Sequence, residues 1–371
     1  MNKRILFFLT QMVMGGAERQ SIQLAKKLND RGWDCRFLSF FADYSHHLVD
    51  EDTAARTTFV GGRRLRDVKS WRACWAAIGR FDPKVVVGVN QAPLRLSVWG
   101  RASGQHSAKT ICTFHSTIID DRRARRRFPL FRWTLPFADC LVYVSHEQRK
   151  YWERRGLWCR RRTVIHNGVD VQSFRPPPDC ETKIAAKRKL GLAGDDFVVG
   201  LVGAFRPEKN HNQLIDAVAV LRRRGMPAKA MLVGGGALRA AIETHAATMG
   251  VGNHVIVAGE QRDVRPFIAA FDVGVLCSVA IETFSMAALE IMAMGVPMVM
   301  SNIGGASEMV ADGTTGYLFP PRDTDALIGR LMILADTESR LRIGQAARDN
   351  TAHQFTSDLM ASRYEALLDT L

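Results

Sequence analysis

Short apolar runs alternate along this chain with longer stretches in which apolar residues recur every three or four positions. The runs are typical of buried strands, and the recurring pattern is typical of helices that pack against a sheet. This alternation predicts parallel sheets, because parallel strands need crossover helices between them. The expected strands are RILFFL, CRFLSFF, VVVGVN, KTICTF and CLVYVS in the first half, and FVVGLVG, AKAMLVGG, HVIVAG, VGVLCS and PMVMSN in the second. The pattern therefore predicts an α/β protein with two doubly wound, Rossmann-like domains.

Three consecutive prolines within residues 174–181 mark the predicted linker, because proline suits neither a helix interior nor a central strand. We expect a first domain over 1–175 and a second over 182–350. An amphipathic helix is expected at about 355–371. Ligands of doubly wound sheets bind at the carboxyl ends of the strands, so two facing domains would hold a ligand in the cleft between them.

The charge of the chain is concentrated in its first half. Residues 1–175 carry 32 Lys and Arg against 15 Asp and Glu, a net charge of +17, whereas the remainder sums to −3. This distribution favours an anionic partner for the first domain, such as phospholipid, polyphosphate or nucleic acid. Cysteines without C-x-x-C spacing favour a reducing compartment, and no apolar stretch is long enough to span a membrane. We expect a cytoplasmic protein that meets a membrane, if at all, at its surface.

Two turns lie between an expected strand and an expected helix. One contains two glycines, and the other contains two basic residues. Gly15 and Gly16 come after the first expected strand, where bare backbone N–H groups at a helix N-terminus attract anions. Arg206 and Lys209 hold the corresponding place in the second domain, where two cations suit a pyrophosphate. Turn geometry for the glycines and a solvated basic loop for the cations are the alternatives that these residues leave open.

Two acidic residues, Glu282 and Glu290, stand eight positions apart in an unusually apolar stretch. On a helix they would lie about 12 Å apart along the axis, so both could contact one elongated ligand. A carboxylate accepts two hydrogen bonds from a vicinal diol, which suits a ribose and a hexose. A glycosidase acid pair and a purely structural role are the alternatives for Glu282 and Glu290.

A second pair of acids, Asp323 and Asp325, has the spacing of a metal site, but helix N-capping explains these residues better.

The flanks of the acidic pair resemble the signature of the retaining glycosyltransferases of family 4. The stretch ETFSMAALEIMAMGVPMVMSNIGGASEMVADGTTGYLFPPRD contains the E-x7-E pair, the small-G-x-P strand entry, the G-G-x-x-E turn and the D-G-x-x-G-x-L-x-P motif. GGAE, FHST, VIHNGVD and RPEKN also match in order and spacing. The resemblance covers nearly the whole chain. It implies a GT-B fold in which the C-terminal helix, at about 355–371, crosses back to the first domain. It also implies a nucleotide-sugar donor held mainly by the second domain, an acceptor held by the first, and no required metal or other cofactor.

The resemblance also implies roles for individual residues. The donor phosphates would meet Gly15 and Gly16, and the diphosphate would meet Arg206 and Lys209. The hexose and α-phosphate would meet Glu282, Phe284 and Ser285, and the ribose would meet Glu290. His115 would lie near the transferred sugar and Asn167 near the cleft, although a lone histidine is more often a core residue.

The chain departs from the family in two places. Ala204 stands where the family usually has arginine, which leaves the task to Arg206, and Ser285 stands where glycine is frequent.

A basic and aromatic stretch points to the acceptor side. It comprises Arg122, Arg123, Arg125, Arg126, Arg127, Phe128, Phe131, Arg132 and Trp133. Arginines meet headgroup phosphates and aromatics enter the interface of a bilayer, so an anionic membrane surface is favoured over a merely solvated helix. No nucleic-acid-binding motif accompanies the charge.

We therefore expect a retaining, metal-independent hexosyltransferase at the cytoplasmic face of a membrane. It would transfer sugar from a UDP-sugar, or next a GDP-sugar, to a glycan or lipid-linked acceptor in polysaccharide or lipopolysaccharide assembly. His115, Arg206, Lys209 and Glu282 would be its catalytic residues. The alternatives are a GT-B epimerase or phosphorylase and a non-catalytic protein that binds membrane or nucleic acid.

Overall fold

The computed structural model describes residues 3–13, 15–44, 49–115, 122–280 and 282–371, with the backbone alone at 122–125 and 127. The chain forms two compact units. The first comprises Met1–Gly168 with Ser357–Leu371, and the second comprises Val169–Thr356. The proline segment 174–181, which was predicted as the linker, belongs to the second unit. The residues just before this segment are also bonded to the second unit: the Val169 amide donates to the Phe355 carbonyl at 2.8 Å, and the Arg265 guanidinium donates to the Ser173 carbonyl at 3.4 Å.

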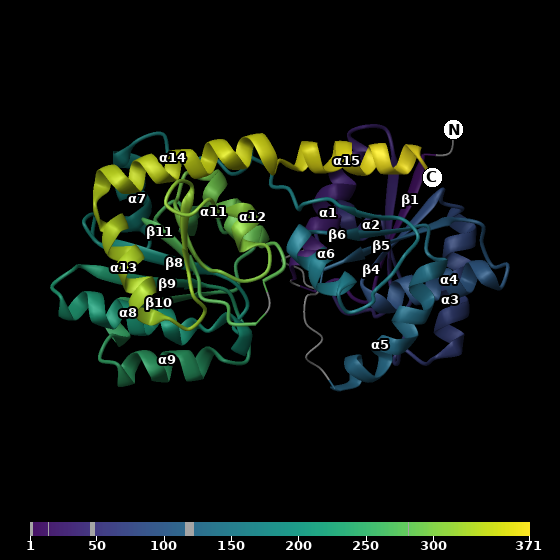
Figure 1. The fold of residues 1–371 in the computed structure, drawn as a ribbon, viewed down its shortest axis with the longest axis horizontal. Helices are drawn as coiled ribbons and strands as arrows, with labels where there is room; N and C mark the ends of the chain where they lie inside the picture. Colours follow the sequence, from purple (N-terminus) through teal and green to yellow (C-terminus); the bar gives the residue numbers. More distant parts are fainter. Residues whose placement is uncertain (1–2, 14, 45–48, 116–121, 281) are drawn as a thin grey trace. The chain divides into compact units, whose positions relative to one another are not determined.

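The first unit is built on a parallel sheet of seven strands in the order β3-β2-β1-β4-β5-β6-β7. Figure 1 labels β1, β4, β5 and β6 of this sheet. The strands are β1 (Arg4–Leu9), β2 (Asp34–Ser39), β3 (Thr57–Phe59), β4 (Val85–Val89), β5 (Lys109–Phe114), β6 (Cys140–Tyr143) and β7 (Arg162–Val164). All five strands predicted for this half are confirmed. The sequence missed β3 and β7, which are three-residue strands at the two edges of the sheet, too short to show a hydrophobic period.

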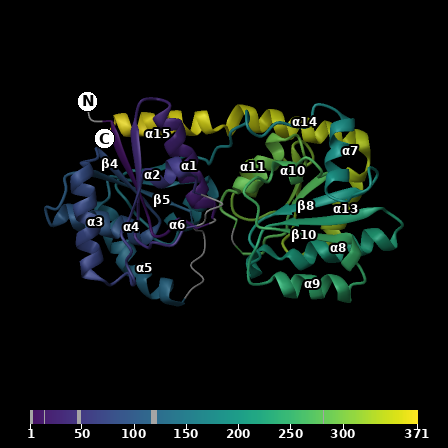
Figure 2. The ribbon, with the colours of Figure 1, turned by 180° about the vertical axis from the view of Figure 1, so that it is seen from behind.

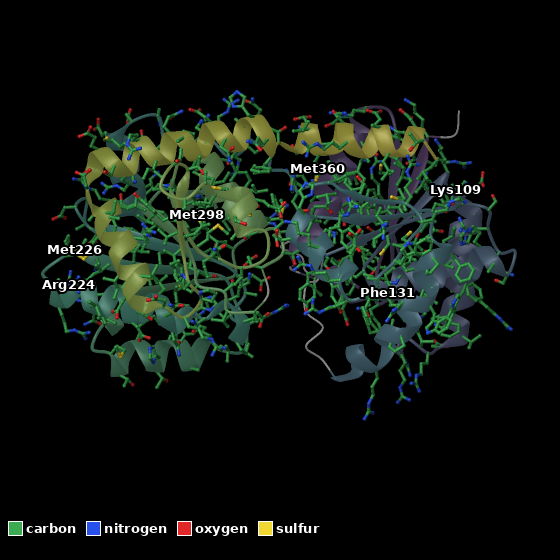
Figure 3. The ribbon with its side chains drawn as sticks, viewed as in Figure 1. Lys109, Phe131, Arg224, Met226, Met298 and Met360 are labelled. Atoms are coloured by element: carbon green, nitrogen blue, oxygen red, sulfur yellow. The ribbon has the colours of Figure 1, made fainter. Side chains whose placement is uncertain are left out.

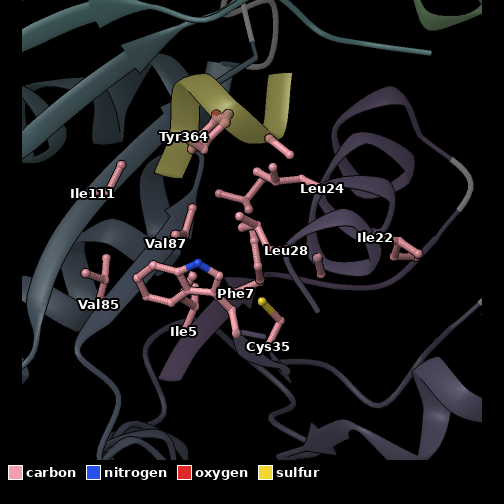
Figure 4. Close-up of a cluster of buried hydrophobic side chains, with 14 of the residues drawn as sticks. Ile5, Phe7, Ile22, Leu24, Leu28, Cys35, Val85, Val87, Ile111 and Tyr364 are labelled. Atoms are coloured by element: carbon pink, nitrogen blue, oxygen red, sulfur yellow. The ribbon is translucent and has the colours of Figure 1, made fainter. Parts of the chain in front are cut away.

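Helices cover both faces of this sheet (Figure 2). They are α1 (Gly16–Asn29), α2 (Glu51–Ala55), α3 (Val68–Phe81), α4 (Gln91–Ala102), α5 (Arg122–Thr134), the 3₁₀ helix η1 (Leu135–Phe137), α6 (His146–Glu153) and α15 (Ser357–Asp369). One core lies between the sheet and the pair α1 and α15, where Tyr364 of α15 packs with Leu24 and Leu28 of α1 (Figure 4). The opposite face is covered by α3 and α4, with α5 packed beside α4.

The last helix, α15, is held on the first unit by polar contacts as well as by its core. Arg31 donates to Glu365 at 3.3 Å, and the Trp33 indole donates to the same carboxylate at 3.0 Å. Met360 packs beside Gln20, whose side chain contacts its sulfur at 3.4 Å (Figure 3). These contacts with α1 and the residues after it make the C-terminal helix part of the first unit, as predicted.

The second unit is built on a parallel sheet of six strands in the order β10-β9-β8-β11-β12-β13. The strands are β8 (Phe197–Val202), β9 (Ala228–Val233), β10 (Val255–Gly259), β11 (Val273–Leu276), β12 (Met298–Ser301) and β13 (Gly316–Phe319). All five strands predicted for this half are confirmed, and the four-residue edge strand β13 was missed. Together the two parallel sheets confirm the predicted doubly wound α/β architecture.

The helices of the second unit again lie on both faces of its sheet. They are α7 (Cys180–Lys189), η2 (Pro207–Lys209), α8 (His211–Arg223), α9 (Arg239–Thr248), η3 (Gly252–His254), α10 (Arg265–Ile268), α11 (Met286–Ala293), α12 (Ala306–Met309), α13 (Thr324–Ala335) and α14 (Thr337–Gln354). Asp323 caps α13 by accepting a hydrogen bond from the Ala326 amide at 2.9 Å, so the N-capping interpretation of this acid is confirmed.

A buried cluster of charges joins α7 to the start of β11. The carboxylate of Asp272 is 4% exposed and contacts Lys187 at 2.8 Å, Lys183 at 2.9 Å and Arg340 at 3.7 Å. It also accepts a hydrogen bond from the Val198 amide at 2.9 Å. Burial raises the pKa of Asp272, but the charges of Lys183 and Lys187 outweigh it and hold this pKa below its usual value. The carboxylate is therefore ionised and fixes α7 against the central strands.

Replacing Asp272 by Asn should lower the free energy of unfolding by about 3 kcal/mol, because Lys187 would stay buried without a counter-charge. Urea denaturation at neutral pH measures this change. The folded-state pKa of Asp272 lies below the unfolded value, so its stabilisation is present above the ordinary carboxyl range and is lost as pH falls through the folded value. The difference between wild type and variant should accordingly shrink in acid.

The matched control is Asp263→Asn, since Asp263 forms an exposed ion pair with Arg265. Its loss should cost less than about 1 kcal/mol. Equal urea midpoints for wild type and Asp272→Asn would contradict the structural role assigned to this cluster.

Candidate functional site

The order of strands in each sheet reverses at one place. In the second unit, the connections run from β8 outward to β10 on one side and from β11 outward to β13 on the other, so β8 and β11 flank the switch point. In the first unit, β1 and β4 flank the corresponding point. Loops that leave the carboxyl ends of such neighbouring strands diverge, and the crevice between them is where doubly wound sheets bind ligands.

The switch point of the second unit holds an ion pair between two predicted residues. Lys209 ends η2, which follows β8, and Glu282 lies in the loop between β11 and α11. The Lys209 Nζ contacts the Glu282 Oε2 at 2.6 Å, and the side chains are 21% and 9% exposed. The Ser278 hydroxyl donates to the same carboxylate oxygen at 2.8 Å. The structure therefore brings Lys209 and Glu282 into direct contact.

Backbone contacts hold the Glu282 loop from two sides. The Val279 amide donates to the Glu208 carbonyl at 2.9 Å, which joins this loop to the turn that carries Lys209. The loop after β12 supports it as well, because the Gly305 amide donates to the carbonyls of Glu282 at 3.2 Å and Thr283 at 3.1 Å. Gly304 has a φ of +56°, and a Cβ built there would lie 1.8 Å from the Glu282 carbonyl oxygen. Only glycine allows this approach.

The predicted residues after Glu282 also have defined places. Ser285 is the N-cap of α11, and its hydroxyl accepts a hydrogen bond from the Ala288 amide at 3.3 Å. The Phe284 ring is buried and packs edge-on against Phe355, with centroids 5.3 Å apart. Glu290 lies within α11 and is 2% exposed. Phe284 thus anchors the loop, and Ser285 sets the start of a helix whose N-terminal amides favour an anion.

The other turn at this switch point is shaped by glycines. The Phe205 amide donates to the Gly235 carbonyl at 2.8 Å, and a Cβ at Gly234 would lie 2.0 Å from the Gly203 carbonyl oxygen. Gly236 likewise lies close to this turn, because a Cβ built there would lie 2.7 Å from the Phe205 carbonyl oxygen. Arg206 is the N-cap residue that precedes η2, and it is exposed.

His211, at the first position of α8, is a further polar residue at this turn. Its side chain packs edge-on against the Phe205 ring, with centroids 4.9 Å apart. It is 2% exposed, and burial together with the Lys209 charge lowers its pKa to about 4. His211 is therefore neutral at physiological pH and supports the turn that carries Lys209.

The first unit holds four of the residues predicted for catalysis and donor binding. Gly15 is the extended N-cap residue of α1 and Gly16 is its first helical residue, where a Cβ would meet nothing within 4 Å. His115 follows β5, and its backbone amide donates to the side chain of Asn90 at 3.0 Å. Burial lowers the pKa of His115 to about 4, so the imidazole is neutral. Asn167 is 3% exposed and is the next-to-last residue of the segment Met1–Gly168.

The predicted membrane stretch divides between core and surface. Phe131 is 1% exposed and packs on Phe114 at a centroid distance of 5.2 Å, so the prediction that it enters an interface is wrong. Phe128 likewise packs on Trp152 at 5.1 Å. Phe131, which Figure 3 labels, belongs to the core beneath α5, and the partly buried Phe128 packs against that core. Trp133 is 77% exposed, and Arg126 and Arg132 are exposed. The side chains of Arg122, Arg123, Arg125 and Arg127 lie outside the described residues.

Several residues of the site were not found from the sequence. Ser278 orients Glu282, Asn90 holds the His115 backbone, and Gly304 closes the loop under Glu282. Asn90 and Gly304 both have positive φ values, at +65° and +56°. The paired glycines of GGASE were the one available signal for Gly304, whereas Ser278 and Asn90 act on partners 4 and 25 residues away through loop geometry that the sequence does not display.

Comparisons with known proteins agree on one family. The model of Glycosyltransferase Family 4 matches residues 14–173, and the model of Glycosyl transferases group 1 matches residues 182–350. The chain is 28% identical to the putative glycosyltransferase EpsD of Bacillus subtilis (strain 168) over 281 residues, 72% of each chain. It is 29% identical to the O-antigen chain mannosyltransferase C of Escherichia coli over 385 residues, 96% of this chain and 95% of that one.

Solved structures with the same fold include glycosyltransferases of the GT-B type. Anabaena HepE in complex with UDP-glucose superposes with a TM-score of 0.88 at 22% identity, covering 99% of this chain and all of that one. Sucrose-phosphate synthase from Thermosynechococcus elongatus superposes with a TM-score of 0.84 at 22% identity, covering 99% of this chain and 98% of that one. These likenesses establish the fold.

Replacing Gly304 by Ala should destabilise the protein by about 2 to 4 kcal/mol, because a positive φ and a backbone clash both oppose the new methyl group. Gly191→Ala is the matched control: Gly191 has a φ of +74° but open space around its Cβ, so only the cost of the backbone conformation, about 1 to 2 kcal/mol, applies. Chemical denaturation of both variants measures the difference. If the two variants lose equal stability, Gly304 does not support the Glu282 loop as described.

Proposed function

The chain belongs to the glycosyltransferases of family 4, and from this premise we propose that it transfers a hexose-type sugar from a nucleotide-diphosphate donor to an acceptor hydroxyl, with retention of the anomeric configuration. The observation that carries the proposal is the contact between Lys209 and Glu282 at the switch point of the second sheet. It places a cation for phosphate and a carboxylate for sugar hydroxyls side by side.

The charge on the leaving group explains the need for cations. In the proposed reaction the bond between the anomeric carbon and the donor diphosphate breaks, the acceptor oxygen forms the new bond on the same face, and the acceptor proton leaves with the departing phosphate. The diphosphate gains negative charge as the sugar becomes oxocarbenium-like. Lys209, the exposed Arg206 and the N-terminal amides of α11 would stabilise that charge.

Glu282 would orient the sugar. An ionised carboxylate only accepts hydrogen bonds, so it suits hexose hydroxyls, and the Ser278 hydroxyl holds one of its oxygens in place. The Lys209 ammonium has three donor hydrogens, so it can keep Glu282 and also bind a phosphate oxygen. Its contact with Glu282 thus orders the site before the donor arrives, which is the preorganisation that electrostatic catalysis requires.

The remaining predicted residues complete the proposed donor and acceptor sites. Glu290 would accept hydrogen bonds from the ribose hydroxyls, and Gly15 and Gly16 would let their backbone approach the donor phosphates. His115, neutral because its pKa is about 4, would offer an uncharged imidazole near the anomeric carbon. The cations named here take over the charge neutralisation that a metal supplies in other transferases, which supports metal-independent transfer without a further cofactor.

We propose UDP-sugar as the donor, with GDP-sugar next. HepE has been solved with UDP-glucose, and a relative that is 32% identical over 250 residues is a GDP-mannose-dependent phosphatidylinositol monomannoside mannosyltransferase from Mycolicibacterium smegmatis. We further propose a glycan or lipid-linked acceptor in polysaccharide or lipopolysaccharide assembly at the cytoplasmic face of a membrane. The net charge of +17 over residues 1–175 supports an anionic membrane surface there. In the described part of the chain, no helix has the length and hydrophobicity to cross a bilayer.

Lys209→Ala and Glu282→Ala should each lower kcat by roughly 100-fold or more, because each removes a group that acts on charge or orientation at the reacting centre. Steady-state transfer from a radiolabelled nucleotide sugar measures the loss. Lys229→Ala is the matched control: Lys229 lies on β9 of the same unit, is 20% exposed against 21% for Lys209, and faces Asp196 at 4.0 Å. It should keep near-normal kcat.

Circular dichroism and the unfolding midpoint separate a lost group from a lost fold in these variants. Near-normal turnover in both Lys209→Ala and Glu282→Ala would overturn the site assignment.

A further inference from the structure

An apolar groove opens on the first unit, beside the α5 stretch that contains Phe131 and Trp133. It lies between α4 and the end of α5 with η1 and has a volume of about 520 Å³. Its walls are mainly apolar and come from Val98, Trp99, Ala102, Leu130, Trp133 and Phe137. We refer to it as the α4–α5 groove. All of these residues lie within the described part of the first unit.

Three of the lining side chains are exposed to an unusual degree. Leu130 is 48% exposed, Trp133 77% and Phe137 66%. They follow one another at spacings of three and four residues, which places them on one side of the helical stretch. Their neighbours Phe131 and Leu135 are 1% and 0% exposed, and these two residues pack into the core of the unit. The outer apolar stripe is therefore not needed to fold the unit, and exposed stripes of this kind mark interaction surfaces.

The groove is held in shape by polar and aromatic contacts. The Arg101 guanidinium on α4 donates to the Asp139 carboxylate and, at 2.6 Å, to the Phe137 carbonyl. Asp139 is itself fixed by the Thr110 amide at 2.7 Å. Trp99 stacks edge-on against Trp71 at a centroid distance of 5.7 Å. Phe137 is thus presented to solvent by an ordered support, not by a loose end of helix.

Exposed arginines form the rim of the groove. On α5 these are Arg126 and Arg132, and the segment Arg122–Thr134 contains no acid. The guanidinium of Arg132 lies within 2.6 Å of a Cβ built on Gly156, so the second basic stretch, Glu153–Arg162, runs beside α5. That stretch adds five arginines and one glutamate, and its Trp158 is 50% exposed. An exposed apolar stripe within a cationic rim complements a surface that is anionic outside and apolar beneath.

We propose that the α4–α5 groove is the surface by which this chain docks on an anionic phospholipid bilayer, with Leu130, Trp133 and Phe137 entering the boundary between headgroups and acyl chains. The arginines of the rim bind lipid phosphates, and the tryptophan lies at the headgroup level. A soluble polyanion would use the arginines but would leave the apolar stripe in water. The inference rests on the membrane location proposed above, but it concerns binding alone and can fail or hold separately from the proposed sugar transfer.

The test is co-sedimentation with vesicles of phosphatidylglycerol mixed with phosphatidylcholine, without any nucleotide sugar. The wild-type chain should bind these vesicles and bind phosphatidylcholine alone much more weakly. The double variant Trp133→Ser, Phe137→Ser should lose roughly tenfold or more in partitioning, because two exposed aromatic side chains no longer enter the bilayer. The binding that remains should be abolished by high salt, because the arginines alone supply it.

Two controls keep the result specific. Leu341→Ser removes a side chain that is 61% exposed in the second unit and should bind vesicles as the wild type does. Trp133→Phe keeps an apolar ring and should retain most of the binding. An unchanged unfolding midpoint shows that the double variant is folded.

Equal vesicle binding by the wild type and the double variant would overturn the proposal, and so would a wild type that ignores anionic vesicles. A wild-type dimer that the double variant turns into a monomer, without vesicle binding by either, would assign the groove to a second copy of the chain. Equal loss of RNA and vesicle binding in the double variant would assign it to a polyanion and would likewise contradict bilayer docking.

Discussion

The ion pair between Lys209 and Glu282 is the constraint on which the candidate site depends. A carboxylate that is 9% exposed needs a cation or hydrogen-bond donors, and Lys209 and Ser278 supply both at 2.6 and 2.8 Å. Those partners come from loops after different strands, so the pair forms only when β8 and β11 lie side by side. The sheet topology thus assembles the site, and the site in turn joins the two loops that leave the switch point.

The two ends of β11 carry different groups of contacts. At the amino end of β11, Asp272 is surrounded by Lys183, Lys187 and Arg340 and holds α7 in place. At the carboxyl end, the Glu282 loop is held by the Gly305 amide and by the close approach of Gly304, with the Phe284 ring packed on Phe355. The contacts of Gly304 and Gly305 therefore fix the backbone of the Glu282 loop. The Lys209 ammonium has three donor hydrogens, so its contact with Glu282 leaves others for a ligand.

The sequence predicted the parts of this structure that depend on local pattern. Buried parallel strands are continuous apolar runs, so ten of them could be located, whereas β3, β7 and β13 are edge strands of three or four residues without a readable period. Lys209 and Glu282 were found because motifs surround them. Ser278 and Asn90 were missed because their partners are set by tertiary contacts, and Phe131 was misplaced because composition alone does not tell the buried face of a cationic helix from its exposed one.

The most direct test of the account is the thermal stability of the chain with UDP, GDP and ADP, each with and without EDTA, in wild type and Lys209→Ala. Binding stabilises the folded state by RT ln(1 + [L]/Kd), about 2.7 kcal/mol at 100 times Kd. A diphosphate site at Lys209 predicts a clear shift with one nucleotide, unaffected by EDTA and lost in Lys209→Ala. A chain that none of these nucleotides stabilises, or a Lys209→Ala variant stabilised as much as the wild type, would contradict a diphosphate site at this lysine.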